Sequence, residues 1–187
     1  AYLDAGMSGG AAGADAGTLS LMIGGDKAAF ERTRALLDKI ASRIFHLGGG
    51  SGAGHTLKLI HNMVLHTIFL ATCEGGRMAE AAGINLPDMI DVFNVSNARS
   101  FISEVRFPKH ILSGKWDGRS RVYNLHKDVS MAVGLAGALD LKVPLGTVTR
   151  DILDAAIAQG MTDTDFSRLY ERFDEIVATV RNTESPD

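Results

Sequence analysis

The chain has 187 residues, a formal net charge of −3 and a pI of about 6.1, and 45% of its residues are hydrophobic. This balance supports a packed core and excludes a disordered chain, and the lack of a basic excess argues against nucleic acid as a partner. A single cysteine excludes an internal disulfide and fits a reducing, cytoplasmic setting, and no apolar run reaches the ~18 residues that a membrane span needs.

The first fifty residues hold short apolar runs that are separated by glycines. Strands are expected at residues 1–5, 18–23 and 43–47, because each run has the length and the flanking glycines of a strand. Residues 26–41 carry apolar side chains at helical spacing, and Asp26 is a good N-cap residue for that helix. The order strand, helix, strand predicts a βαβ-type unit.

After a glycine-rich joint at residues 48–52, the pattern becomes almost wholly helical. Residues 53–82 contain no proline and predict a single helix about 45 Å long. A helix of this length usually bridges two domains or reaches into a partner subunit, so we expect a homodimer or a higher homo-oligomer. Shorter helices are expected at residues 86–95, 100–113, 125–139, 143–158 and 165–181.

The most informative segment is a glycine-rich turn at Gly52 and Gly54 that runs into the apolar start of the long helix. Lys58 and Asn62 stand four residues apart on this helix, so they project from one face and can converge on one small ligand. An apolar setting lowers the pKa of a lysine and suits it to proton transfer. The alternative is a snorkelling lysine beside an asparagine on the helix surface.

A second candidate site lies at the end of the first strand, where Ser8 is followed by Gly9 and Gly10. Two glycines allow backbone N–H groups to approach a ligand, and such a turn suits a carboxylate. An ordinary strand-to-loop turn is the alternative interpretation. The glycine-rich residues 11–18 that follow are predicted to be too flexible for a helix.

A third candidate is Lys127 with Asp128 near the start of a later helix, although such a pair is typical of a solvated surface. The histidines give no metal site, because His61 and His66 are five residues apart and do not share a helical face well. No carboxylate pattern accompanies them. We therefore predict no metal.

Taken in order, the three pieces resemble the β-hydroxyacid dehydrogenase family. They are Asp4-Ala5-Gly6-Met7-Ser8-Gly9-Gly10, Gly52-x-Gly54-x-x-x-Lys58-x-x-x-Asn62 and Lys127-Asp128. The family includes 3-hydroxyisobutyrate dehydrogenase, tartronate semialdehyde reductase and the larger 6-phosphogluconate dehydrogenase. The resemblance implies a Rossmann-like NAD(P) domain, a long linking helix and an all-helical domain that forms the dimer contact.

The resemblance leads us to expect a mainly α chain. Residues 1–48 would be a short α/β remnant of the Rossmann-like domain, and residues 49–187 the linking helix plus an all-helical substrate and dimerisation domain. No Gly-x-Gly-x-x-Gly fingerprint occurs, so the dinucleotide phosphate site is expected to be absent from this chain. Alone, the chain is expected to be inactive.

The resemblance also implies a role for each candidate residue. Lys58 would exchange the proton of the substrate hydroxyl, Asn62 would hold the substrate, and residues 8–10 would grip its carboxylate. Lys127 would lie near the nicotinamide end of NAD or NADP, with Asp128 as its electrostatic partner. The predicted function is NAD(P)-dependent interconversion of a small β-hydroxy acid, of the 3-hydroxyisobutyrate type, and its carbonyl form.

Two functions other than a dehydrogenase are alternatives for this sequence. The first is a non-catalytic helical dimerisation or binding module on the same scaffold. The second, acyl or phosphoryl transfer at Ser8, lacks a histidine or carboxylate placed to activate the serine. Departures at Gly6-Met7, where many members have Pro-Val, and at His61 put the substrate in question more than the reaction, and the retained Lys58 argues against an imine reductase.

Overall fold

The computed structural model describes residues 1–180, and the chain divides into two compact units, Ala1–His61 and a second that begins at Asn62. The long helix α3, Ala53–Ala81, contributes residues to both units. It agrees closely with the helix predicted over residues 53–82. Among the described residues, no helix is long and apolar enough to cross a membrane.

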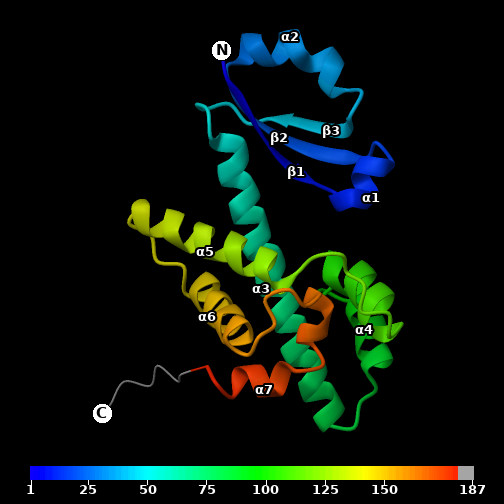
Figure 1. Cartoon of the computed structure of the whole chain (residues 1–187). Coiled ribbons are helices and arrows are strands. Elements are labelled where there is room, and N and C mark those ends of the chain that lie inside the picture. Colours follow the sequence, from blue (N-terminus) through cyan, green and yellow to red (C-terminus); the bar gives the residue numbers. More distant parts are fainter. Residues whose placement is uncertain (181–187) are drawn as a thin grey trace. The chain divides into compact units, whose positions relative to one another are not determined.

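The first unit is built on a three-stranded mixed sheet (Figure 1). β1 (Leu3–Ser8) pairs antiparallel with β2 (Leu19–Gly25), and β2 pairs parallel with β3 (Ala41–His46). The parallel pair is connected through α2 (Lys27–Leu37), which gives the predicted βαβ unit.

Local sequence explains both helices that accompany the sheet. Asp26 caps α2 as predicted, because its carboxylate accepts a hydrogen bond of 2.8 Å from the backbone N–H of Ala29. The expectation that residues 11–18 form no helix is wrong, since α1 occupies Gly10–Asp15. Positive φ angles at Gly9 and Gly10 let the chain turn from β1 directly into α1.

The predicted fold class, mainly α with a short α/β remnant, is wrong. The first unit has a hydrophobic core of its own, formed by Leu21, Ile23, Phe30 and Ala41 between the sheet and α2. A sheet that buries a core against a crossover helix is an α/β unit rather than an appendage of a helical domain. The chain therefore has an α/β beginning followed by a helical unit.

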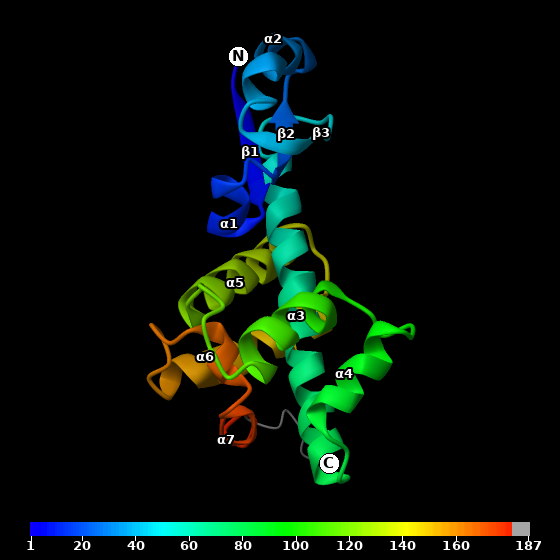
Figure 2. The ribbon, with the colours of Figure 1, turned by 90° about the vertical axis from the view of Figure 1, so that its right-hand side faces the viewer.

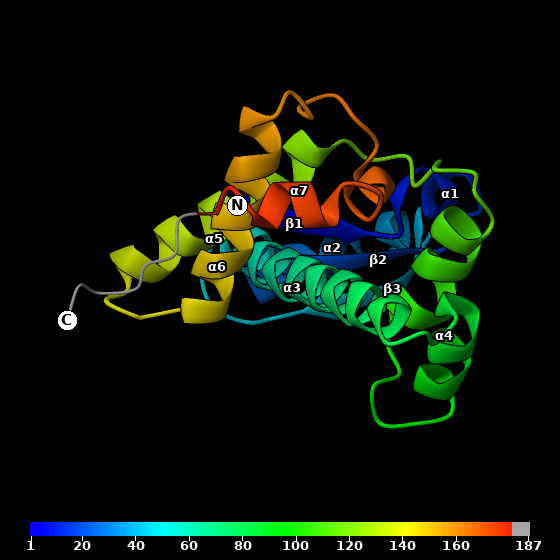
Figure 3. The same cartoon turned by 90° about the horizontal axis from the view of Figure 1, so that it is seen from below.

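The second unit is helical and is built around the C-terminal part of α3 (Figure 2). α5 packs against α6, and α6 packs against α7 (Figure 3). Its core includes Phe69, Phe107, Val129 and Leu153, all essentially inaccessible to water. The elements after α3 are α4 (Leu86–Asn94), the π-helix η1 (Ile102–Leu112), α5 (Val122–Ala138), α6 (Pro144–Ala158), the short 3-10 helix η2 (Phe166–Leu169) and α7 (Phe173–Val177).

One predicted helix of this unit is wrong. Residues 165–181 do not form a single helix, because η2 and α7 are separate elements, and Arg181 lies outside the described residues. Asp165 starts η2 by accepting a hydrogen bond from the N–H of Ser167. Buried Leu169, Tyr170 and Phe173 then keep the chain against the core through the break.

Candidate functional site

In the first unit, strand β1 and the start of α3 lie side by side, and a buried carboxylate joins them. Asp4 is 2% exposed. Its two oxygens accept hydrogen bonds from the backbone N–H groups of Gly52, at 2.6 Å, and His55, at 2.8 Å. A carboxylate at a helix N-terminus satisfies N–H groups that lack partners within the helix and interacts favourably with the helix dipole.

The pKa of Asp4 reflects these contacts. Burial alone would raise the pKa of this carboxyl, but the hydrogen bonds from His55 and Gly52, together with the nearby His55 side chain, outweigh burial and hold it below its usual value. His55 Nδ1 lies 3.4 Å from the carboxylate. Asp4 is therefore an ionised anchor at neutral pH rather than a candidate acid catalyst.

Glycines allow the backbones of β1 and α3 to approach closely. A Cβ atom at Gly6 would lie 2.5 Å from the carbonyl oxygen of Gly54 and 2.7 Å from the Cβ of Lys58, which leaves no room for a side chain. Lys58 is half-buried. The contact at Gly6 therefore fixes the base of the Lys58 side chain against β1.

The turn that follows β1 continues along the same side of the strand. Alternate residues of a strand share one face, so Ser8 projects to the side on which Asp4 and Gly6 meet α3. Two strand residues span about 7 Å, a length that a lysine side chain can nearly match. The structure places the base of Lys58 against β1 at Gly6, and strand alternation leads us to expect the turn at residues 8–10 on the same side of β1.

In the second unit, the amide of Asn62 is held by Asp128. Asn62 Nδ2 donates a hydrogen bond of 2.6 Å to Asp128 Oδ2, and Asn62 is 8% exposed. The other oxygen of Asp128 lies 3.1 Å from the Nζ of Lys127. Asp128 was predicted only as a partner of Lys127, and the structure shows that it also orients Asn62.

Lys127 is the residue of this unit that was predicted to contact the dinucleotide cofactor. The Lys127 side chain is 47% exposed, and its ammonium group has three N–H donors. The ion pair with Asp128 does not use all of them. This donor set suits the polar nicotinamide-ribose end of NAD or NADP. Among residues 1–180, no cluster of three or more His, Cys, Asp or Glu side chains could hold a metal ion.

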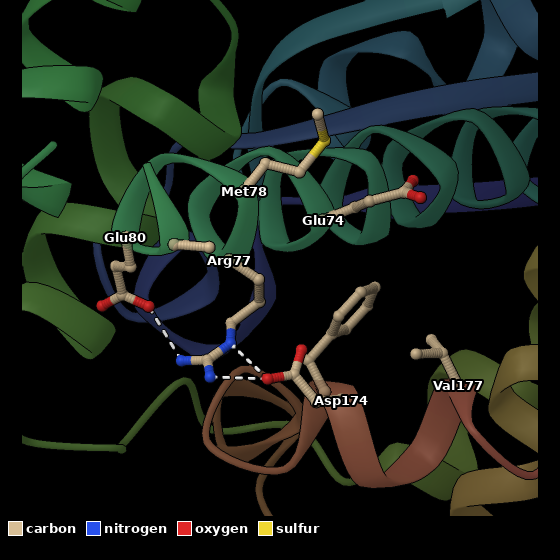
Figure 4. Close-up of a pocket in the computed structure, with 8 residues that line it drawn as sticks. Glu74, Arg77, Met78, Glu80, Asp174 and Val177 are labelled. Carbon is tan, nitrogen blue, oxygen red and sulfur yellow. Dashed lines mark hydrogen bonds and ion pairs between the residues drawn. The ribbon is translucent and has the colours of Figure 1, made fainter. Parts of the chain in front are cut away.

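A separate groove of about 670 Å³ lies in the second unit, between the end of α3 and α7. Arg77 occupies its rim and bonds Asp174 at 2.6 Å and Glu80 at 2.8 Å (Figure 4). Its floor is apolar, from Met78, Phe173 and Val177 among others. Because the arginine is already neutralised, the groove offers ion pairs that fasten α7 to α3 rather than an evident catalytic group.

The predicted site residues therefore fall into two sets. Residues 8–10 and Lys58 belong to the first unit, and Asn62, Lys127 and Asp128 belong to the second. Sequence reasoning missed the anchoring role of Asp4. A signal was available, because an aspartate in the middle of an apolar strand is seldom buried without N–H partners.

Comparison with known proteins gives matches over most of the chain. A family model described as NAD-binding of NADP-dependent 3-hydroxyisobutyrate dehydrogenase matches residues 52–173. A second, described as the NAD binding domain of 6-phosphogluconate dehydrogenase, matches residues 1–48. Both agree with the predicted cofactor, NAD or NADP, and the second agrees with an α/β first unit.

Individual relatives give the same picture. The chain is 29% identical over 175 residues to 2-(hydroxymethyl)glutarate dehydrogenase of Eubacterium barkeri, a match that covers 94% of this chain and 58% of the relative. It is 32% identical over 174 residues to L-threonate dehydrogenase of Pectobacterium atrosepticum, covering 93% and 57%. The crystal structure of 3-hydroxyisobutyrate dehydrogenase from Salmonella typhimurium superposes with a TM-score of 0.81 at 32% identity, covering 90% of this chain and 59% of that chain. The chain thus spans about three-fifths of the length of these proteins.

Proposed function

Because the chain belongs to the β-hydroxyacid dehydrogenase family, we propose that it acts in the NAD(P)-dependent interconversion of a small β-hydroxy acid and its carbonyl form. The observation that carries the proposal is the fixed placement of Lys58 beside the strand that ends in the Ser8-Gly9-Gly10 turn. An amine and a turn that could bind a carboxylate, both next to one strand, would fit the two ends of such a substrate.

Lys58 is the proposed proton carrier. When bound, NAD(P) would accept the hydride from the carbinol carbon. As that carbon is oxidised, Lys58 Nζ takes the proton of the substrate hydroxyl, and in the reverse direction it returns a proton to the carbonyl oxygen. The half-buried position of Lys58 limits competition from water for this proton.

The turn at residues 8–10 is the proposed carboxylate grip. The first N–H groups of α1 follow Gly9, where a helix has no internal acceptors for them, and the Ser8 hydroxyl adds a donor. Holding the acid group would keep the carbinol within reach of Lys58. Such a proximity effect lowers the activation barrier by roughly several kcal/mol. Gly9 and Gly10 carry no side chain that would obstruct the approach of the carboxylate to the backbone.

Asn62 and Asp128 are the proposed positioning pair of the second unit. Asn62 follows Lys58 by one helical turn of α3, and the 2.6 Å bond from its amide nitrogen to Asp128 fixes the orientation of the amide. Asp128 also pairs with Lys127, the proposed contact to the nicotinamide end. One carboxylate thus sets the geometry of a substrate group and a cofactor group.

The relatives support a hydroxy acid as substrate but differ in which one. Their names specify (hydroxymethyl)glutarate, L-threonate and 3-hydroxyisobutyrate, which share a carboxylate and an alcohol. The shared groups are those that the turn at residues 8–10 and Lys58 would bind. We therefore propose the class of small hydroxy acids, with 3-hydroxyisobutyrate as the first substrate to assay.

The test is the substitution Lys58→Met in a full-length form that includes a dinucleotide phosphate site, with Lys27→Met as the matched control. Lys27 is exposed at the start of α2, so its loss should leave the rate unchanged. Loss of a general acid–base group should lower kcat/KM by about 10²- to 10⁴-fold, with an unchanged circular dichroism spectrum. An unchanged rate in Lys58→Met would instead favour a non-catalytic dimerisation or binding module on this scaffold.

A further inference from the structure

Among residues 1–180, one of the arginines of the second unit that lie over aromatic rings has no ion-pair partner. Arg106 lies in the π-helix η1 and is half-buried. The Cζ atom of its guanidinium lies 4.5 Å from the ring centroid of Phe166 and 5.9 Å from that of Phe101. Among residues 1–180, no hydrogen bond or ion pair engages this guanidinium.

The carboxylate that acts on this charge is committed elsewhere. Asp165 accepts hydrogen bonds from the backbone N–H groups of Gly118, Arg119 and Ser167 and from the hydroxyl of Ser167, at 2.6 to 3.1 Å. Burial lowers the pKa of Arg106, and the attraction of Asp165 offsets this only in part. The Asp165 carboxylate accepts hydrogen bonds from the loop before α5. The N–H groups of Arg106 can therefore donate to an acceptor other than Asp165.

Three other arginines of this unit also stack on aromatic rings, and each has a carboxylate partner. Arg77 lies over Tyr170 and pairs with Asp174, Arg121 lies over Tyr123 and pairs with Asp163, and Arg168 lies over Trp116 and pairs with Glu171. Their distances to the rings are 5.6 to 5.8 Å, longer than that of Arg106. The most closely stacked guanidinium is therefore the one without a counter-ion among the described residues.

We propose that Arg106 is the anchor of an oxyanion site that takes a carboxylate or phosphate group of a small ligand. A guanidinium presents a planar fork that matches either group through two parallel hydrogen bonds. The contact of the guanidinium with the Phe166 ring, at 4.5 Å, restricts the Arg106 side chain, so less side-chain freedom is lost on binding. Partial burial strengthens the attraction relative to an exposed arginine.

This site is distinct from the proposed reaction. It contains neither Lys58 nor the turn at residues 8–10, and ligand binding there does not depend on dehydrogenase activity. The exposed Arg119 on the loop before α5 donates its backbone N–H to Asp165, the carboxylate that acts on Arg106, and adds positive charge to this region. The proposal can therefore fail or succeed independently of the assay on Lys58.

The experiment compares Arg106→Gln with Arg168→Gln, because Arg168 is also stacked on a ring but already paired. Each protein is titrated with inorganic phosphate and, separately, with glutarate at constant ionic strength, and the unfolding midpoint is followed. The wild type and Arg168→Gln should show a saturable rise in midpoint. In Arg106→Gln the apparent affinity should fall at least tenfold.

Direct observation of the guanidinium guards against a variant that does not fold. In the wild type, the Nε–H resonance of Arg106 should shift saturably with the same anion, and Arg106→Lys should bind more weakly because it loses the fork. Saturation by phosphate alone assigns a phosphate-bearing ligand, and saturation by glutarate a carboxylate. No saturable response in the wild type, or an equal response in Arg106→Gln, overturns the proposal.

Discussion

The two ends of α3 are fastened by different physical devices, each within its own unit. At the N-terminal end, the buried carboxylate of Asp4 accepts two backbone hydrogen bonds, and Gly6 and Gly54 allow direct backbone contact. At the C-terminal end, Arg77 bonds Asp174 and Glu80 at the protein surface. Buried groups that lose a partner cannot turn to water, whereas exposed ones can, so the two ends should respond very differently to mutation.

The largest loss of stability is expected from Gly6→Ala. The new Cβ would lie 2.5 Å from the backbone oxygen of Gly54, and backbone cannot move aside as a flexible side chain can. Overpacking of this kind should lower the free energy of unfolding by about 2–3 kcal/mol, measured by urea denaturation. Gly134→Ala in α5 is the control, because nothing lies within 4 Å of its added Cβ. Equal effects of the two substitutions would contradict the close contact.

The next largest loss is expected from Asp4→Asn. An amide nitrogen in place of one oxygen would face a backbone N–H donor, so one buried hydrogen bond is lost at about 1–3 kcal/mol. Urea denaturation at pH 7 measures this loss. Glu31→Gln on the exposed side of α2 serves as the control and should change little.

Asp4 should also make the free energy of unfolding depend on pH. The pKa of Asp4 is lower in the folded state than in the unfolded chain, so its contribution is complete above the unfolded pKa of about 3.9 and is lost as the pH falls through the folded value. Wild-type stability should therefore drop more steeply than that of Asp4→Asn on acidification from pH 5 to pH 2. Parallel curves for the two proteins would show that Asp4 is not the group responsible.

Much of the helical unit could be predicted from sequence, because the helical spacing of apolar residues and the positions of glycine and proline indicate the same helix boundaries. The long helix α3 lacks proline and ends two residues before Gly83. In the first unit, Asp26 likewise signals the start of α2, because its side chain caps that helix. Residues 165–181 were misjudged because helical spacing continues through the break, while tertiary burial of Tyr170 and Phe173 decides where the backbone turns.

The site was predictable only as a set of residue types. The spacing of Lys58 and Asn62 is a local helical property and can be read from the sequence. The bond between Asn62 and Asp128 joins residues 66 positions apart, so it depends on how α5 packs and no local pattern could reveal it. The same holds for Arg106: within residues 1–180 it has no ion pair, because Asp165 accepts hydrogen bonds from the loop before α5.

The smallest effect is expected at the other end of α3, from Asp174→Asn. The bond from Arg77 lowers the pKa of Asp174, but both side chains are solvated, with 37% and 63% of their surfaces exposed. Water and salt replace such a pair at little cost, and Glu80 remains to hold the guanidinium. Urea denaturation at 0.15 M salt should show no resolvable change in unfolding free energy. A loss as large as that of Asp4→Asn would mean that the groove between α3 and α7 is drier than these exposures indicate, and that the two ends of the helix are fastened equally well.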